Sequence, residues 1–283
     1  MLKQRIITAI VLLAVLLPAL AYPSPEPFCL LILLLIAAGA WEWGRLNKLN
    51  AGASWTLALV ALLICAGLWQ AGWLEKPSVS LWLPVGALWV LVGASLIKRG
   101  VEGWAKIAGP LRVAGGLLAL CLTWLAVGQA RVIGINFLLS VLVLVWVADI
   151  AAYFAGRAFG LRFTKVKLAP AISPGKSWEG VWGGMTGVLL LALGWIWGDQ
   201  AWQAVSPSLY SRLASVNVIL LILAVVFLAA MSVVGDLVES LIKRSAGVKD
   251  SSNLLPGHGG VLDRVDALLP TVPLAMMLYA LVA

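Results

Sequence analysis

Long apolar stretches alternate with short polar connections along the whole chain, and this pattern predicts membrane-spanning helices. A helix that crosses about 30 Å of hydrocarbon needs about 20 mostly apolar residues. Nine stretches meet this requirement, near residues 6–22, 28–43, 55–74, 81–97, 111–130, 136–155, 180–198, 216–238 and 262–282. The sequence therefore predicts an all-α polytopic membrane protein with about nine transmembrane helices.

The composition excludes several other classes of protein. Of the 283 residues 62% are hydrophobic and only 11% are charged, with a mean hydropathy of +1.02, so the chain cannot cover a soluble globule with a polar surface. Cys29, Cys65 and Cys121 each lie inside an apolar run. We expect these cysteines to be inert packing residues, with no disulfide or metal framework.

The distribution of lysine and arginine predicts the orientation of the spans. Cytoplasmic flanks of membrane helices are enriched in these residues. Seventeen of the 20 cations fall on the side of the N-terminus, and only Lys76, Arg131 and Arg212 fall on the other. We therefore expect a cytosolic N-terminus and an external C-terminus, which makes the net charge of +8 largely a consequence of topology.

The first predicted span has a second interpretation. Lys3 and Arg5 precede an apolar run that ends in Ala19–Ala21, as in a secretory signal with a cleavage site. Cleavage would leave eight spans with the same orientation. We expect the first 21 residues to be retained as a helix.

The connection over residues 156–179 is unusually basic. Arg157, Arg162, Lys165, Lys167 and Lys176 occur there, and no acid lies between Ile150 and Trp178. Such a surface would concentrate a polyanion. The positive-inside bias alone also predicts cations in this connection.

The segment SPGKSWEG, Ser173 to Gly180, leads directly into the seventh predicted span. We expect Lys176 and Ser177 to lie at its helix N-terminus, where free N–H groups favour a phosphate. The segment is not a Walker A motif, because Pro170 stands where that motif needs glycine. The alternative is an ordinary helix start, with Ser177 as cap and Glu179 in the first turn.

A polar stripe follows the apolar part of the eighth span. Asp236, Glu239, Ser240 and Lys243 fall at i, i+3, i+4 and i+7, which is one face of a helix. Ionisable residues at membrane depth normally face a partner or a watery cavity. A structural ion pair between Glu239 and Lys243 is the alternative for those two, and it leaves Asp236 unexplained.

The connection over residues 239–261 carries Lys249 and His258, the only histidine, and the ninth span then begins with Asp263 and Asp266. Two acids in a first helical turn also have a structural interpretation, because carboxylates favour the helix dipole there. Since the connection is short, we expect Asp236 and Asp263 to converge on one hard cation. Magnesium fits oxygen ligands better than zinc does.

Asp149 is a further acid, about two turns before Arg157 in the sixth span. A buried acid satisfied by Arg157 or by backbone groups and a role in a substrate pocket are equally good interpretations. The unusual connections divide the chain into N-terminal helices 1–135, expected as scaffold with dimer and lipid contacts, and a catalytic membrane domain, 136–283.

Residues 240–266, SLIKRSAGVKDSSNLLPGHGGVLDRVD, resemble the signature of phosphatidate cytidylyltransferases, also called CDP-diacylglycerol synthases. SPGKSWEG and GDLVES also look like segments of that family, so the resemblance covers about Asp149 to Asp266. The fixed positions of the signature are present at Ser240, Lys243, Arg244, Lys249, Asp250, Pro256, His258, Gly259, Gly260, Asp263, Arg264 and Asp266.

The resemblance implies an enzyme that converts CTP and phosphatidate to CDP-diacylglycerol and diphosphate in phospholipid biosynthesis. It also implies Mg²⁺, a second monovalent cation such as K⁺, a homodimer among membrane lipids, and a bacterial inner membrane with the active site facing the cytosol. No nucleic-acid partner is expected. Asp236 and Asp263 resemble the family's metal ligands.

The remaining assignments carry the resemblance over residue by residue. Asp236, Asp263, Lys243 and Lys249 are expected to be catalytic. Residues expected to bind substrate are Asp149, Arg157, Ser173, Lys176, Ser177, Glu179, Ser240, Arg244, His258, Gly259, Gly260, Arg264 and Asp266.

The chemistry is consistent with these residue types. Phosphatidate already carries an anionic oxygen, so attack on CTP needs charge neutralisation and orientation rather than a strong base. An ion-coupled transporter is a second hypothesis, motivated by Asp149 and Asp236. A CTP-dependent polyprenol kinase is a third, whereas a CDP-alcohol phosphotransferase would need an Asp-Gly-x-x-Ala-Arg motif that the sequence lacks.

Overall fold

Nine helices within the described residues are long and apolar enough to span a membrane, as the sequence predicts. The computed structural model describes residues 2–282, with side chains from Gln4 onward. The spans are α1 (Leu2–Ala21), α2 (Glu26–Leu46), α3 (Ala51–Gln70), α4 (Val79–Ala105), α5 (Gly109–Ile133), α6 (Ile135–Phe159), α7 (Trp178–Ala201), α9 (Val218–Ala246) and, as a broken last span, α10 (Leu262–Val265) with α11 (Leu268–Val282).

Three short elements occupy the connections. A 3-10 turn, η1 (Trp73–Glu75), follows α3, and the amphipathic helix α8 (Leu209–Val216) precedes α9. Strands β1 (Lys167–Ala169) and β2 (Ser173–Ser177) form an antiparallel hairpin between α6 and α7. The fold is therefore all-α apart from this hairpin within the part of the chain that is described.

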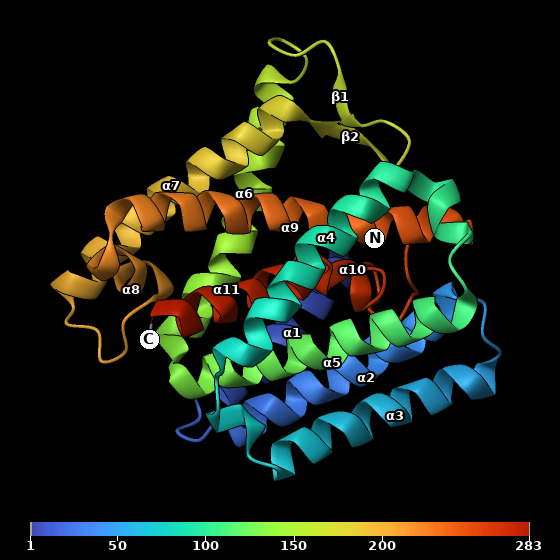
Figure 1. Cartoon of the computed structure of the whole chain (residues 1–283), viewed down its shortest axis with the longest axis horizontal. Coiled ribbons are helices and arrows are strands. Elements are labelled where there is room, and N and C mark those ends of the chain that lie inside the picture. Colours follow the sequence, from blue (N-terminus) through green and yellow to red (C-terminus); the bar gives the residue numbers. More distant parts are fainter. Residues whose placement is uncertain (1, 283) are drawn as a thin grey trace.

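Figure 1 shows how the spans are arranged. α2, α3 and α5 lie side by side, α6 and α7 form a closely packed pair, and α9 runs through the middle between α4, α7 and α11. The hairpin, the C-terminal part of α9, α10 and the N-terminal end of the chain lie toward the top and right of the view. We call this side, with connections 47–50, 106–108, 160–177 and 247–261, the basic end.

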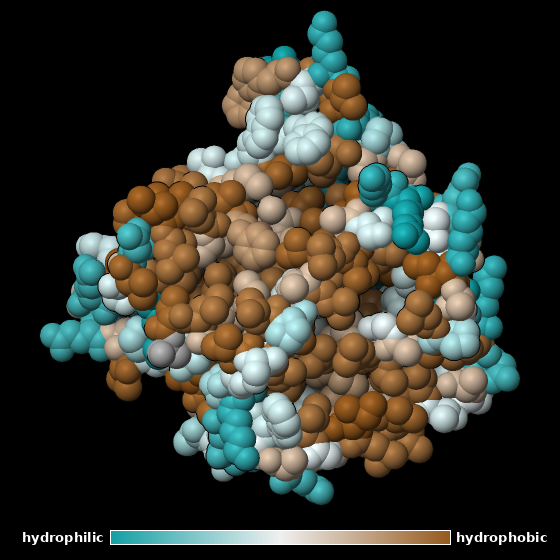
Figure 2. All heavy atoms as spheres, viewed as in Figure 1, coloured by the Kyte–Doolittle hydropathy of each residue, from teal (hydrophilic) through white to brown (hydrophobic). Residues whose placement is uncertain are grey.

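The bundle has an apolar interior and an apolar exterior. Fully buried side chains include Trp124, Phe137, Leu144 and Leu228. Figure 2 shows that the outer face is also largely hydrophobic and that hydrophilic residues gather at its edges. This distribution is expected of helices whose outer surfaces contact lipid, so the chain is a multi-pass membrane protein.

Helix α9 is longer than the sequence predicts, and this corrects the boundary of the connection expected at 239–261. The helix continues to Ala246 and is capped by Gly247, whose φ of 77° is left-handed. Its N–H group bonds back to the last turn, as in other glycine-terminated helices. The connection itself therefore covers only residues 247–261, and the predicted helical spacing from Asp236 to Lys243 is confirmed.

The expected connection 156–179 also needs correction. α6 extends to Phe159, and β2 includes Gly175 and Lys176, so these two residues lie in a strand that leads directly into the helix N-terminus. Ser177 is the N-cap of α7 and accepts a hydrogen bond from the Gly180 N–H at 3.2 Å. The predicted capping by Ser177 is therefore confirmed, and its expected contact with substrate stays a prediction.

Candidate active site

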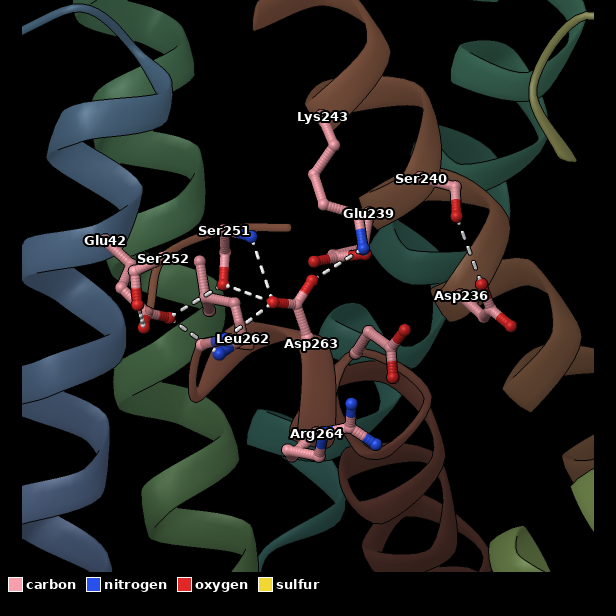
Figure 3. A network of polar contacts seen from close by, with 12 residues as sticks. Glu42, Asp236, Glu239, Ser240, Lys243, Ser251, Ser252, Leu262, Asp263 and Arg264 are labelled. Carbon is pink, nitrogen blue, oxygen red and sulfur yellow. Dashed lines mark hydrogen bonds and ion pairs between the residues drawn. The ribbon is translucent and has the colours of Figure 1, made fainter. Parts of the chain in front are cut away.

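A charged cluster lies where α9 meets the start of the last span (Figure 3). The Lys243 ammonium donates to Asp263 Oδ1 at 2.7 Å and forms an ion pair with Glu239 one turn earlier in α9. The side chains of Lys243, Glu239 and Asp263 are only 13%, 6% and 6% exposed. Because a buried charge is costly without partners, this cluster must be held by compensating contacts.

Asp263 organises the connection that leads back to it. Its Oδ2 accepts hydrogen bonds from the Ser251 N–H and hydroxyl, both at 2.9 Å, and from the Gly260 N–H at 2.7 Å. Both ends of residues 251–260 are therefore tied to one carboxylate oxygen, while the other oxygen faces Lys243. A carboxylate with four donors is strongly stabilised as the anion.

Glu42 of α2 holds the same connection from the opposite side. Its side chain is fully buried and accepts hydrogen bonds from the hydroxyls of Ser251 and Ser252 and from the N–H groups of Val261 and Leu262. No site residue is predicted from the sequence within positions 1–135. An acid inside a predicted membrane span was the available signal, but its partners are about 210 positions away.

The paired glycines of the connection leave room for these carboxylates. A Cβ on Gly260 would lie 2.0 Å from Ser251 Oγ and 2.4 Å from Glu42 Oε1. Gly259 has a left-handed φ of 84°, and a Cβ there would lie 2.7 Å from Asp263 Oδ2. Both glycines were expected to bind substrate. In the structure, close packing of the connection explains why neither position has room for a side chain.

A second carboxylate–lysine pair connects the hairpin to α9. Lys176 of β2 lies 2.5 Å from Asp236 Oδ2, and the Ser240 hydroxyl donates to Asp236 Oδ1 at 3.2 Å. These side chains are 25% and 30% exposed for Lys176 and Asp236. The hairpin thus places Lys176, the lysine of SPGKSWEG, in contact with the polar stripe of α9.

Asp149 and Asp266 are the remaining acids of the predicted site. Asp149 is exposed on α6, and Asp266 is partly exposed and accepts a hydrogen bond from the Ala267 N–H at 2.8 Å. Arg157 donates to the Tyr153 hydroxyl instead of pairing with Asp149. Asp149 is therefore neither buried nor satisfied by Arg157, and its role in a substrate pocket stays a prediction.

Asp236 and Asp263 do not face each other. In Figure 3 the Asp236 carboxylate points away from Asp263, and Glu239 lies between them. Within residues 2–282 no three His, Cys, Asp or Glu side chains form a group that could hold a metal ion. The structure brings each carboxylate to a different lysine, so the expected convergence of Asp236 and Asp263 on one cation is not observed, and the site has two separate carboxylate–lysine pairs.

The other predicted residues line the rim of the site or support it. Arg157, Arg244 and Lys249 are exposed at the basic end, and Ser173 is partly exposed in β2. Glu179 is buried and accepts hydrogen bonds from the N–H groups of Phe163 and Thr164, so it supports the base of the hairpin.

His258 and Arg264 contact each other through the backbone. The Arg264 guanidinium donates twice to the His258 carbonyl, at 2.9 and 2.5 Å. The His258 Nδ1 atom is buried and has no hydrogen-bond partner within the described chain. Arg264 therefore fixes the glycine-flanked turn, and the His258 imidazole retains a free polar atom.

The fold and the site define a polytopic membrane protein with two carboxylate–lysine pairs and further cations at its basic end, which is a suitable arrangement for polyanionic substrates. The sequence profile of the Cytidylyltransferase family matches residues 3–282. The chain belongs to this family, and it is a nucleotidyltransferase.

Three relatives show the extent of the similarity. A phosphatidate cytidylyltransferase of Pseudomonas aeruginosa is 39% identical over 99% of this chain and 98% of that protein. The proteins of the same name from Haemophilus influenzae and Bacillus subtilis are 36% and 30% identical, over 99% of this chain and 99% and 98% of their own lengths. The similarity therefore includes the N-terminal helices as well as the site.

Proposed function

We propose that this chain transfers the cytidylyl group of CTP to phosphatidate, which yields CDP-diacylglycerol and diphosphate. The names of the full-length relatives support this reaction. The observation that assigns the reaction to particular residues is the presence of two carboxylate–lysine contacts along one stretch of α9. Asp236 contacts Lys176 at a half-buried position, and Lys243 contacts Asp263 at a buried one. Such a site suits charge neutralisation between two phosphate-bearing substrates.

In the reaction, an anionic oxygen of the lipid phosphate attacks the α-phosphorus of CTP. A new P–O bond forms there, the bond from the α-phosphorus to the oxygen bridging to the β-phosphorus breaks, and diphosphate leaves with that electron pair. No protein nucleophile and no strong base are needed. Lys176 and Lys243 bind the phosphates and orient the attack, and Arg244, Lys249 and His258 add donors at the rim.

Mg²⁺ belongs to this proposal, together with a second, monovalent cation such as K⁺. Asp236 and Asp263 each supply hard carboxylate oxygens of the kind Mg²⁺ prefers, but they face different lysines. One of them would therefore hold the ion, and substrate phosphates would complete the coordination. The ammonium groups of Lys176 and Lys243 contact Asp236 and Asp263, so positive charge is stabilised beside each carboxylate. When bound, the ion would neutralise phosphate charge and stabilise the departing diphosphate.

We also propose the orientation and assembly that the resemblance implies. The excess of lysine and arginine at the basic end supports a cytosolic N-terminus and a cytosolic active site, in the inner membrane of a bacterium. There the lipid keeps its acyl chains in hydrocarbon while its phosphate meets CTP. A homodimer is the assembly expected from the family, and light scattering of the purified protein in detergent tests it.

The reaction is tested with CTP labelled at either the α- or the γ-phosphate. Purified protein with phosphatidate and Mg²⁺ is expected to place only the α-label in the lipid product. Incorporation of the γ-label instead would establish a kinase and overturn the proposal. Uptake of solute into proteoliposomes without consumption of CTP would favour the transporter.

A further inference from the structure

An apolar groove of about 450 Å³ opens between α4 and α5. These consecutive helices diverge, because α4 packs mainly against α9 and α11 while α5 packs mainly against α2 and α11. Figure 2 shows that the face with α4 and α5 is predominantly hydrophobic. The groove therefore lies within the apolar surface that lipid covers, and its volume is in the usual range for ligand pockets, roughly 300–1,000 Å³.

Arg112 is the only charged residue that lines this groove. It lies in the first turn of α5 at the basic end, with its guanidinium carbon 5.8 Å from the centroid of the Trp104 ring. The Nε atom is buried without a hydrogen-bond partner. No carboxylate of residues 2–282 forms an ion pair with Arg112, so its charge is available to an anion from outside the chain.

The groove and the active site share two helices. Trp43 lines the groove, and its neighbour Glu42 holds the connection 247–261. On α9, Val238 and Ile242 line the groove, and the residues that follow each of them are Glu239 and Lys243. The groove and the charged cluster are thus built in part by the same stretches of α2 and α9.

We propose that this groove binds one acyl chain of the diacyl phosphate substrate and that Arg112 holds the lipid phosphate before it reaches the charged cluster and attacks CTP. The inference rests on the proposed function and gives its lipid substrate a position. An apolar groove with one cation at its membrane-interface end matches one acyl chain and the anionic head of such a lipid. Arginine suits this role because its planar group binds phosphate with two parallel hydrogen bonds.

Filling the groove provides the first test. Gly115 lines the groove, and a Cβ built on it meets no heavy atom within 4 Å, so Gly115→Phe places a ring in the open space. Gly67 in α3 is a matched control, because its Cβ also has open space and it does not line the groove. The measurement is kcat/KM for phosphatidate with C16 chains divided by kcat/KM for phosphatidate with C8 chains.

We expect Gly115→Phe to lower this ratio by about tenfold, because several buried methylene groups of the longer chain lose their contacts. Gly67→Phe should keep the wild-type ratio. Arg112→Gln should raise KM for phosphatidate about tenfold while KM for CTP stays unchanged. Lys106→Gln, which removes an exposed cation near the same end, should change neither KM.

A binding measurement separates this inference from the proposed function. Phosphatidate with a photoactivatable diazirine near the end of one acyl chain should label peptides of residues 85–122 in the wild-type protein, and Gly115→Phe should lose that label. If the wild-type protein makes no CDP-diacylglycerol, the proposed function fails. If it makes the product but the label lies elsewhere, or Gly115→Phe keeps the wild-type chain-length ratio, the groove proposal is overturned.

Discussion

Glu42 and Leu262 are 220 positions apart in the sequence, yet the Leu262 N–H donates to Glu42 Oε2 at 2.8 Å. The Val261 N–H and the Ser252 hydroxyl donate to the other oxygen of the same carboxylate. A carboxylate in the second span therefore fixes the backbone immediately before Asp263. The position of Asp263, an acid of the proposed site, therefore depends on an N-terminal helix.

Replacing Glu42 tests this dependence. Glu42→Gln keeps the shape of the side chain but exchanges an acceptor oxygen for an amide donor that faces other donors. We expect a loss of about 1–3 kcal/mol in the free energy of unfolding, the usual cost of a buried polar mismatch. Hydrogen exchange in residues 247–261 should become faster. Glu102→Gln, at an exposed position, is the control, and equal exchange in both variants would contradict the role of Glu42.

Lys176 is expected to bind CTP, and Lys167 on the facing strand of the hairpin provides a matched comparison. Lys176 contacts Asp236, whereas Lys167 is exposed. Lys176→Gln should raise KM for CTP by about tenfold or more, because charge-assisted contacts to phosphate are lost. Lys167→Gln should stay within twofold of the wild-type protein in the same steady-state assay. Similar KM values in both variants would remove Lys176 from the site.

Lys243 compensates two buried acids, so its loss should affect stability as well as activity. Lys243→Gln leaves Glu239 and Asp263 without their shared cation, and breaking a buried ion pair costs roughly 3–5 kcal/mol. The double variant Glu239→Gln/Lys243→Gln should regain part of that stability without regaining activity. Thermal unfolding in detergent and the transfer assay measure the two effects. A double variant that recovered full activity would contradict a catalytic role for Lys243.

Gly260 is expected to tolerate no side chain. A Cβ there would overlap both Ser251 Oγ and Glu42 Oε1, so Gly260→Ala must displace the connection that positions Asp263. We expect activity to fall by at least tenfold and the unfolding temperature to decrease. Gly67→Ala, with open space around its Cβ, should resemble the wild-type protein. A fully active Gly260→Ala variant would show that the close packing is dispensable.

Much of the fold could be predicted because apolar length alone defines a membrane span. All nine spans were expected, and the spacing of Asp236, Glu239, Ser240 and Lys243 predicted their common helix. The predicted membrane span ended at residue 238, because hydropathy does not include the charged turns through which α9 continues to Ala246. Hydropathy does not recognise a charged helical turn that is stabilised by contacts with a neighbouring span.

The parts of the site that were missed depend on contacts between distant segments. Glu42 is a single acid among apolar residues, and nothing near it in the sequence indicates which N–H groups it binds. The hairpin that places Lys176 in a strand directly before the N-cap of α7 depends on pairing between Lys167 and Ser177. The orientation of each carboxylate, Asp236 or Asp263, depends on which lysine it contacts. The spacing of residues along the chain does not determine that pairing.

The initial rate of α-label transfer from CTP to phosphatidate by purified Asp236→Asn tests the central claim most directly. Asp236 contacts Lys176 and Ser240 at a partly exposed position, so this variant should fold with a normal unfolding temperature. If the charged site on α9 is the active site, the rate should fall by more than about 100-fold. A folded Asp236→Asn protein that transfers the label within twofold of the wild-type rate would contradict the account.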